Sequence, residues 1–384
     1  MNILVEKFGP GYEVSSGADT VPIQWVEGLK EKDSIDRIYL LGGLNLWTDE
    51  KPWSWAGYTL YGISKDSEER HTYWSPNDIF EAIKNEDIDV IHAHTRGKTL
   101  NNLNVALKSR KKIPLIYTVH GVDSLSNPLD RELFEIADVI TAPSPYVADL
   151  IKKLGYGDKV MWVPNSTDFY KYKHDEEVKK KSEEIRKKYA QNNEKLILIT
   201  GRLQEDKGVY ELAEAICELV NEGYNVKMIH AGIIFSEGEK DRLTNIFRSY
   251  GLESRLVLLG KIPEDDPKSL AAVYKAADVF ILPSDGTYEN CPMSALEALA
   301  METPTIVSMV GGPKSVFVDY GLALGVKPRD KHSIKDAIRY YLDNEEKEIK
   351  RAKTASKVVE MFFSTEFVTD ILVKLYTKLT QEKI

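Results

Sequence analysis

Short apolar runs alternate with helix-period segments along most of the chain. In the first half, β-branched and apolar residues predict strands at Asn2–Lys7, Arg37–Leu41, Val90–Ala93, Leu115–Val119, Val139–Ala142 and Val160–Val163. In the second half they predict strands at Leu196–Thr200, Val226–Ala231, Leu256–Leu259, Val279–Leu282 and Thr305–Ser308. Most runs are followed by polar, glycine or proline residues and then by a helical pattern, which is typical of βα alternation and a parallel sheet.

The pattern also indicates two similar halves. "ADVITAPS" (Ala137–Ser144) and "ADVFILPS" (Ala277–Ser284) each predict a helix end, a buried strand and a Pro-Ser turn. Between the halves lies the most charged stretch, Tyr170–Lys195, which predicts a solvated helix with mixed-charge pairs. Near the chain end, apolar residues at four-residue spacing predict an amphipathic helix that packs on the protein itself: Phe367, Ile371, Leu375 and Leu379.

Length supports this division, because 384 residues exceed one typical hydrophobic core. We predict an N-terminal Rossmann-like domain over residues 1–168 and a C-terminal one over 169–361. Residues 362–384 are expected to return to the N-terminal domain as a helix. The predicted class is α/β, with two doubly wound parallel sheets.

Composition narrows the function classes. Lys+Arg 51 against Asp+Glu 60 gives a net charge of −9, which argues against nucleic acid as the main partner. Cys217 and Cys291 stand alone, so neither a disulfide framework nor a CxxC metal site is expected. Because we found no apolar run of membrane-spanning or signal-peptide length, we expect a cytoplasmic protein with at most peripheral membrane contact.

Three tempting motifs fail on inspection. Gly97-Lys98-Thr99 resembles the end of a phosphate-binding P-loop, but His92 occupies the place of its first glycine. Gly9-Pro10-Gly11 lacks the third small residue of a dinucleotide fingerprint, because Val14 stands there. His92 and His94 share one strand face, but no further ligand accompanies them, so no metal is predicted.

The stretch "TYENCPMSALEALAMETP" (Thr287–Pro304) carries two glutamates eight positions apart. The preceding strand ends at Pro283-Ser284, at the carboxyl edge of the sheet, where ligands of open α/β folds bind. Pro292 is predicted in the first helical turn, and a buried face is predicted from Met293, Leu296, Leu299 and Ala300. Glu289 then lies in the loop and Glu297 on the helix. Between them, the amides near Asn290–Ser294 form a helix N-terminus that attracts phosphate.

A carboxylate on each side of a phosphate site suits a nucleotide sugar, with one glutamate accepting from ribose hydroxyls and the other from hexose hydroxyls. The alternative is that Glu289 only stabilises the helix through its charge near the positive end of the helix dipole, and that Glu297 is an ordinary surface glutamate. Arg202 and Lys207, in "LITGRLQEDKG", favour the ligand, because two cations at the head of a βα unit suit a diphosphate. Gly311-Gly312 at another strand end would allow close backbone approach to a ligand.

Together, "PSDGTYENCPMSALEALA", "TGRLQEDKG", "VGGPKSV" and "VPNSTD" resemble the retaining nucleotide-sugar glycosyltransferases of the GT-B fold, the group 1 type with two glutamates that seven residues separate. The resemblance covers nearly the whole chain and is densest from Ile199 to Val316. It implies two Rossmann-like domains facing a central cleft, with the donor on the C-terminal one. The donor-binding residues would be Gly17, Arg202, Lys207, Asn290, Cys291, Met293, Ser294 and Glu297, and Glu289 would hold the transferred sugar.

The N-terminal domain would supply the acceptor side. "SSGADTVPIQWVEGL" resembles the family's glycine-rich loop and first helix, with Gly17 at the turn, and "DVIHAHT" and "IYTVHG" resemble its strand ends. The resemblance implies His94 at the acceptor and His120 at the reacting centre. The alternative for His120 is a structural histidine. Trp53 and Trp55 belong to an aromatic-rich stretch that either stacks on an acceptor sugar or packs within a β-rich insertion.

Several positions depart from the family's pattern. Ser16-Gly17 replaces two glycines, Asp19 replaces a glutamate, and Lys314-Ser315 replaces an acidic residue. Glu302 stands in place of a frequent glycine. Before Asp168, Pro-Asn-Ser, which ends at Ser166, replaces the family's usual Pro-Asn-Gly. None of these changes touches the glutamate pair, so they bear on the identity of the donor.

The expected reaction is metal-independent hexosyl transfer from a nucleoside-diphosphate sugar to a hydroxyl of a sugar, a lipid-linked sugar or a small molecule. No cofactor is expected beyond this co-substrate. The resemblance implies front-face substitution with retention, in which the departing phosphate helps to deprotonate the acceptor. Three alternatives stay open: a sugar phosphorylase on the same fold, a non-catalytic nucleotide-sugar-binding subunit, and a sugar-nucleotide epimerase. The base, sugar, acceptor and linkage are not determined by the sequence.

Overall fold

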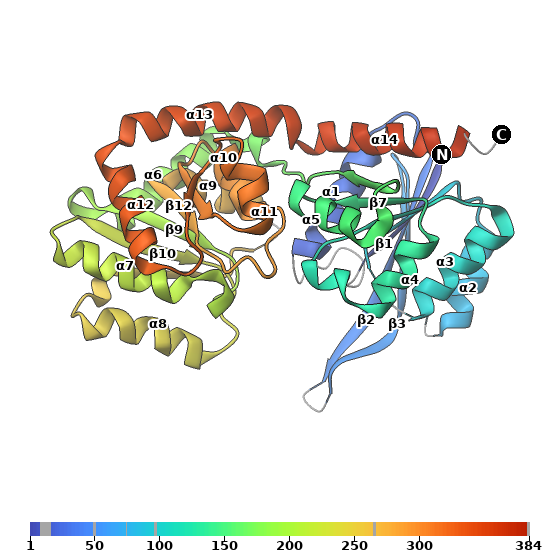
Figure 1. Cartoon of the computed structure of the whole chain (residues 1–384), viewed down its shortest axis with the longest axis horizontal. Helices are drawn as coiled ribbons and strands as arrows, with labels where there is room; N and C mark the ends of the chain where they lie inside the picture. The colour runs from blue at the N-terminus through green and yellow to red at the C-terminus, as the bar shows by residue number, and fades with distance from the viewer. Residues whose placement is uncertain (8–16, 49–50, 74, 96–97, 264–265, 382–384) are drawn as a thin grey trace. The chain divides into compact units, whose positions relative to one another are not determined.

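A computed structural model describes residues 1–7, 17–48, 51–73, 75–95, 98–263 and 266–381 (Figure 1). The chain divides into two compact units, Met1–Ser166 together with Thr365–Ile384, and Thr167–Ser364. These boundaries lie two and three residues from those of the predicted domains, 1–168, 169–361 and 362–384. Among the described residues, no helix combines the length and apolarity needed to cross a bilayer.

The N-terminal unit is a sheet with helices on its faces (Figure 1). Its strands are β1 (Asn2–Lys7), β2 (Arg37–Thr48), β3 (Lys51–Ile63), β4 (Glu68–Tyr73), β5 (Val90–Ala93), β6 (Leu115–Thr118), β7 (Val139–Ala142) and β8 (Val160–Trp162). Its helices are α1 (Gly17–Leu29), α2 (Pro76–Lys84), α3 (Lys98–Lys111), α4 (Pro128–Ile136), α5 (Pro145–Ile151) and α14 (Thr365–Gln381). The strand order is β4-β3-β2-β1-β5-β6-β7-β8.

The outer strands of this sheet differ from the prediction. β2 continues seven residues beyond the predicted Arg37–Leu41, and it pairs antiparallel with β3, which pairs antiparallel with β4. The prediction gave no strand bounds between residues 42 and 89, although a β-rich insertion was one interpretation of the aromatic-rich stretch that contains Trp53 and Trp55. Periodicity is weak there, because β3 carries Pro52 and Gly57 and β4 reads EERHTY. The remaining strands pair in parallel, as expected from their short apolar runs.

The C-terminal unit has a parallel sheet in the order β11-β10-β9-β12-β13-β14. Its strands are β9 (Lys195–Thr200), β10 (Val226–Ala231), β11 (Leu256–Gly260), β12 (Val279–Leu282), β13 (Thr305–Ser308) and β14 (Leu324–Val326). The prediction missed β14. Its helices are α6 (Glu176–Tyr189), α7 (Val209–Asn221), α8 (Glu237–Ser249), α9 (Pro267–Ala276), α10 (Met293–Ala300), α11 (Gly311–Pro313), α12 (Lys331–Asp343) and α13 (Glu345–Phe362). Relative to the first strand of the unit, the order reads 3-2-1-4-5-6, the arrangement of a Rossmann fold.

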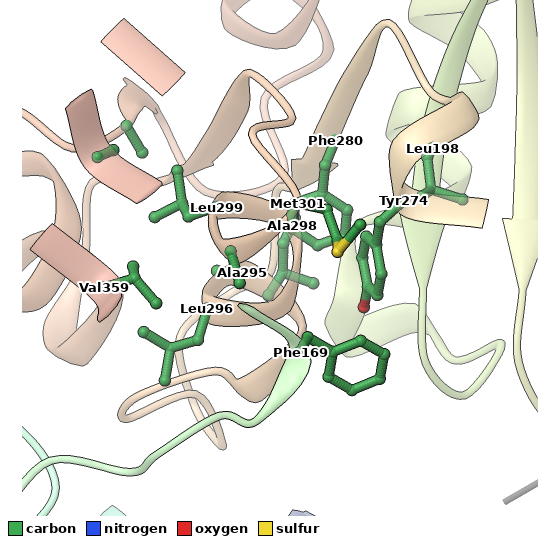
Figure 2. Close-up of a cluster of buried hydrophobic side chains, with 14 of the residues drawn as sticks. Phe169, Leu198, Tyr274, Phe280, Ala295, Leu296, Ala298, Leu299, Met301 and Val359 are labelled. Carbon is green, nitrogen blue, oxygen red and sulfur yellow. The ribbon is translucent and has the colours of Figure 1, made fainter. Parts of the chain in front are cut away.

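Figure 2 shows the hydrophobic cluster on which α10 packs, one of two that cover this sheet. Helix α10 buries Ala295, Leu296 and Leu299 completely, as its apolar spacing predicts. Two details of the prediction are wrong. Pro292 is the N-cap, with extended ψ of 120°, and the helix begins one residue later. Met293, the first residue of the helix, is only half-buried.

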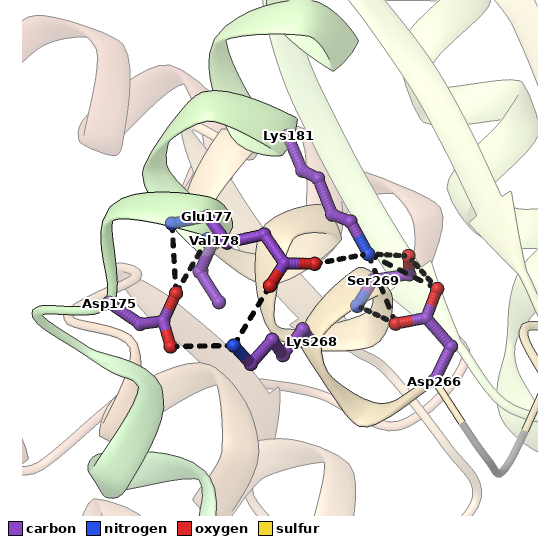
Figure 3. Close-up of polar contacts among 7 residues, drawn as sticks. All are labelled: Asp175, Glu177, Val178, Lys181, Asp266, Lys268 and Ser269. Carbon is purple, nitrogen blue, oxygen red and sulfur yellow. Dashed lines mark hydrogen bonds and ion pairs between the residues drawn. The ribbon is translucent and has the colours of Figure 1, made fainter.

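The charged stretch before β9 forms α6, which belongs to the C-terminal unit. Figure 3 shows how it is linked to α9 by ion pairs. The Lys181 ammonium lies 3.2 Å from Asp266, and the Lys268 ammonium lies 2.9 Å from both Asp175 and Glu177. Asp175 also caps α6 by accepting hydrogen bonds from two backbone amides. The mixed charges therefore orient a surface helix, consistent with the predicted solvated face.

Helix α14 packs in the N-terminal unit. Its buried stripe contains Val368, Leu372, Leu375 and Tyr376. The predicted stripe is wrong by about one position, because Phe367, Ile371 and Leu379 are only half-buried. A Cβ at Gly28 of α1 would lie 2.7 Å from Thr365, so glycine allows α1 and α14 to approach closely.

Candidate functional site

The order of the C-terminal sheet places a topological switch point between β9 and β12, because the strands that follow each of them in the chain lie on opposite sides. Open α/β sheets bind ligands at such points. Lys207 follows β9, and Glu289 follows β12. The Lys207 ammonium and Glu289 Oε1 form an ion pair across the switch point. Their side chains are only 13% and 12% exposed, so the pair is largely shielded from water. The structure thus brings together two residues that are 82 positions apart.

Close backbone packing holds these two loops together. The Asp285 amide donates to the Asp206 carbonyl at 2.9 Å. Gly208 has a left-handed φ of +70°, and a Cβ there would lie 2.3 Å from the Pro283 carbonyl oxygen. Only glycine fits such a position without moving the backbone. The N-cap of α7 and the residue that follows β12 are therefore fixed relative to each other.

Gly312, after β13, has a similar role. A Cβ there would lie 1.8 Å from the Asn290 carbonyl oxygen. Gly312 therefore makes room for the chain's own backbone, whereas the sequence predicted room for a ligand beside Gly311-Gly312. The contact fixes the segment that leads into α10.

The backbone amides at the start of α10 include two that donate no hydrogen bond within the helix. The amides of Ala295 and Leu296 both donate to the Pro292 carbonyl, and no hydrogen bond joins the Met293 or Ser294 amide to any described residue. Asn290 and Cys291, predicted with them as donor-binding residues, are buried, at 4% and 2% exposed. The helix thus has two leading amides and a positive dipole end at this edge.

Glu297 lies on α10 and is half-buried. Its Oε2 accepts a hydrogen bond of 2.7 Å from the Tyr274 hydroxyl, which is itself 2.8 Å from Thr200 Oγ1. Burial raises the pKa of Glu297 to about 7, although the Tyr274 hydrogen bond acts in the opposite direction. The sequence prediction missed Tyr274 and Thr200, because a tyrosine within a helix and a threonine at a strand end look like ordinary structural residues.

Arg202 lies two residues beyond the end of β9 and is half-exposed. No ion pair joins its guanidinium to Glu289, Glu297 or any other acidic residue in the described part of the chain. The structure therefore places Arg202 at the same sheet edge as Lys207 but does not bring it into contact with the two glutamates.

The N-terminal sheet has its own switch point, between β1 and β5. His94 follows β5, and His120 lies two residues beyond β6. His94 Nδ1 is 3.0 Å from His120 Nε2, and the rings stack with centroids 5.2 Å apart. Burial, followed by the proximity of His92 and His120, holds the pKa of His94 well below its usual range. A neutral His94 therefore shares one hydrogen bond with His120.

The same edge contains a buried acid that the sequence prediction overlooked. Glu6, at the end of β1, is 0% exposed. Its Oε2 accepts from Asn104 Nδ2 at 3.0 Å, and no hydrogen bond reaches its Oε1 within the described residues. Burial raises the pKa of Glu6 to about 8, and the Asn104 hydrogen bond only partly opposes it. The only sequence signal was a glutamate at the end of an apolar strand.

Three predicted residues of the N-terminal unit cannot be assigned contacts. Gly17 begins α1, but the preceding part of its loop, residues 8–16, lies outside the described residues. Trp53 and Trp55 belong to the backbone of β3, and their side chains also lie outside the description. Their acceptor role stays a prediction.

Family comparisons match both units of the chain. Residues 181–358 match the profile described as glycosyl transferases group 1, and residues 55–169 match glycosyltransferase family 4. The chain is 29% identical over 275 residues to "Putative teichuronic acid biosynthesis glycosyltransferase TuaC" of Bacillus subtilis, covering 68% of this chain and 64% of that protein. It is 36% identical over 145 residues to an uncharacterized glycosyltransferase of Methanocaldococcus jannaschii, covering 38% and 35%. The matches thus span less than two thirds of both relatives.

A further relative is a D-inositol 3-phosphate glycosyltransferase of Corynebacterium aurimucosum, 25% identical and covering 72% of this chain and 68% of that protein. Among solved structures, Anabaena Alr3699/HepE in complex with UDP has a TM-score of 0.74 at 16% identity, with 98% of this chain and all of that chain covered. Sucrose-phosphate synthase of Thermosynechococcus elongatus has a TM-score of 0.75 at 18% identity, with 99% of both chains covered. At these identities the structures establish the fold, which is GT-B.

Proposed function

Because the chain belongs to the glycosyl transferases group 1 family, we propose that it transfers a hexose from a nucleoside-diphosphate sugar to an acceptor hydroxyl, with retention at the anomeric carbon. The C-terminal unit would bind the donor and the N-terminal unit the acceptor. The proposal rests on the family and on the chemistry gathered at the switch point between β9 and β12.

One observation carries the proposal: the shielded contact between Lys207 and Glu289. A cation beside a carboxylate matches the junction of a diphosphate with a sugar. The Lys207 ammonium would face the phosphate oxygens, and Glu289 would accept hydrogen bonds from the hydroxyls of the sugar. The Anabaena protein of the same fold has been solved with UDP-glucose, which is consistent with a nucleotide-sugar ligand at such a site.

The neighbouring groups would hold the rest of the donor. The amides of Met293 and Ser294 and the half-exposed Arg202 would bind the diphosphate. Glu297, in the second turn of α10, would accept from the ribose hydroxyls. Because Tyr274 already donates to Oε2, the ribose would use Oε1 and the second lone pair of Oε2.

In the proposed reaction, the bond between the anomeric carbon and the phosphate oxygen breaks, and the diphosphate leaves with the bonding electrons. The acceptor oxygen forms the new bond on the same face, and its proton passes to the departing phosphate. Lys207, Arg202 and the helix amides would stabilise the charge that develops on the leaving group. His120, held by its hydrogen bond to His94, would orient the transferred sugar.

The first experiment is a thermal-shift screen with UDP, GDP, ADP and TDP sugars, followed by turnover of the best donor with a panel of hydroxyl acceptors. Retention is read from the anomeric proton coupling in the product. We expect Lys207→Met and Glu289→Gln each to lower turnover by about 100-fold, because each removes an interaction with the reacting diphosphate sugar.

Lys240→Met is the matched control, since it removes an exposed cation of the same unit. Stabilisation by no nucleotide sugar would contradict the proposal. Cleavage of a disaccharide that needs inorganic phosphate and no nucleotide would replace it with a phosphorylase.

A further inference from the structure

Tyr274 connects the hydrophobic core of the C-terminal unit to the proposed donor site. The residue lies on α9 and is 1% exposed. Its hydroxyl lies between two polar groups, Glu297 Oε2 at 2.7 Å and Thr200 Oγ1 at 2.8 Å. Thr200 is the last residue of β9, at the switch point, so the three side chains join the sheet edge to α10.

The direction of these hydrogen bonds follows from the donors available. A tyrosine hydroxyl has one proton, and the carboxylate of Glu297 accepts it. Thr200 must then donate its own hydroxyl proton to Tyr274 Oη. The two hydrogen bonds therefore run from Thr200 to Tyr274 and from Tyr274 to one carboxylate oxygen of Glu297, Oε2.

Core packing fixes where this hydroxyl lies. Figure 2 shows the Tyr274 ring between the rings of Phe169 and Phe280. Their centroids are 6.3 Å and 5.8 Å from that of Tyr274, and both pairs meet edge to face. The Thr303 hydroxyl donates to the Tyr274 backbone carbonyl at 2.8 Å. These contacts hold the ring from both sides within the close-packed cluster.

A phenylalanine would fill the same apolar space without burying a hydroxyl. Burying a hydroxyl is unfavourable unless it forms hydrogen bonds, and here both bonds go to groups at the sheet edge. The hydroxyl is thus better explained by Glu297 than by the core around it.

We propose that Tyr274 is a positioning residue: its hydroxyl, backed by Thr200, holds the Glu297 carboxylate in the one orientation that accepts both hydroxyls of a vicinal diol. The inference rests on the proposed function, in which that diol is the ribose of the donor. Its consequence is selectivity. With the carboxylate plane fixed, a ribonucleotide makes two hydrogen bonds and a 2′-deoxyribonucleotide makes one.

The test is calorimetric titration of nucleoside diphosphates and their 2′-deoxy analogues, using UDP, GDP or ADP, whichever binds best. We expect wild-type protein to bind the ribonucleotide about tenfold or more tightly than the deoxy form. In Tyr274→Phe this preference should fall to about threefold or less, mainly through weaker ribonucleotide binding. Thr200→Val should reduce it less, and it provides the decisive measurement if Tyr274→Phe does not fold.

Tyr341→Phe is the control, since it removes a hydroxyl from an equally buried tyrosine in the other core cluster and should keep the wild-type preference. A variant that loses affinity for both nucleotides equally, or keeps the full preference, would overturn the positioning role while leaving the proposed function intact. Wild-type protein that binds none of these nucleotides would overturn the proposed function and the positioning role together.

Discussion

Replacing Glu6 with glutamine should stabilise the N-terminal unit, and by more as the pH rises. Glu6 is fully buried, and burial raises its pKa from 4.5 to about 8. Between these two values the folded state holds a proton that the unfolded chain has released. Stability therefore falls as the pH rises through this window, which is the sign expected for an acid whose pKa is raised on folding.

The magnitude follows from the shift. Each pKa unit corresponds to about 1.4 kcal/mol, so the full shift of 3.5 units, from 4.5 to 8, is worth about 5 kcal/mol. At pH 7 most of the window has been crossed, and the expected loss is about 3 kcal/mol. Glutamine keeps the oxygen that accepts from Asn104 but has no charge to bury, so Glu6→Gln escapes this loss.

The assay uses the distribution of tryptophans. All six lie in the N-terminal unit, at Trp25, Trp47, Trp53, Trp55, Trp74 and Trp162. Urea unfolding followed by tryptophan fluorescence therefore reports on this unit alone. Wild type and Glu6→Gln are compared at several values between about pH 5.5 and pH 8, where the difference in unfolding free energy should grow by about 3 kcal/mol.

The experiment compares the two proteins because buried histidines change the unfolding free energy with pH in the opposite sense to Glu6. Burial lowers the pKa of His92 to about 3, so its contribution to stability is present above about pH 6.5 and is lost as the pH falls. Subtracting the two profiles removes this common term. Glu68→Gln, at an exposed position of β4, controls for the substitution itself. A difference that stays constant with pH would show that Glu6 is hydrated or paired in the folded protein.

Two further predictions concern the C-terminal unit. Gly208→Ala should destabilise it by at least about 3 kcal/mol, whereas Gly321→Ala should cost only about 1 kcal/mol; the two glycines share a φ near +70°, but only a Cβ at Gly208 meets a backbone carbonyl. Far-UV circular dichroism during urea unfolding measures both, and equal losses would contradict the steric argument. Nucleotide-sugar affinity should rise by up to about tenfold between pH 6 and pH 8 and then level off, because the ionised carboxylate of Glu297 accepts from the ribose hydroxyls better than its protonated form does. Calorimetry from pH 6 to pH 8 tests this, and a Glu297→Gln variant with the same pH profile as wild type would refute it.

The βα alternation was predictable because parallel strands buried on both faces appear as short apolar runs. The predicted strands Val90–Ala93 and Val279–Leu282 coincide with β5 and β12. A β-rich insertion was one interpretation of the aromatic-rich stretch, but the bounds and antiparallel pairing of its strands were not predictable, because β3 and β4 mix charged, aromatic, glycine and proline residues. Their strand character comes from pairing with β2, a tertiary interaction that periodicity does not encode.

The candidate site, too, could be predicted from the sequence only in part. Strand ends can be located in a sequence, so Lys207 and Glu289 could both be assigned to the carboxyl edge of the sheet. Their mutual contact could not, because it depends on β9 and β12 being neighbours. Tyr274 could not be predicted for a different reason. Its ring packs like that of any core tyrosine, and only the hydrogen bond from its hydroxyl to Glu297 distinguishes it.

The polar groups named at the two switch points differ in their charge state near neutral pH. In the N-terminal unit, burial moves each pKa toward the uncharged form, with Glu6 at about 8 and His92 at about 3. Such groups are largely uncharged near neutral pH, which suits hydrogen bonding to an uncharged hydroxyl. In the C-terminal unit, Lys207 and Glu289 are shielded together as an ion pair. A diphosphate needs fixed positive charge, which the N-terminal groups named here do not supply, so this difference is a physical reason to assign the donor to the C-terminal unit.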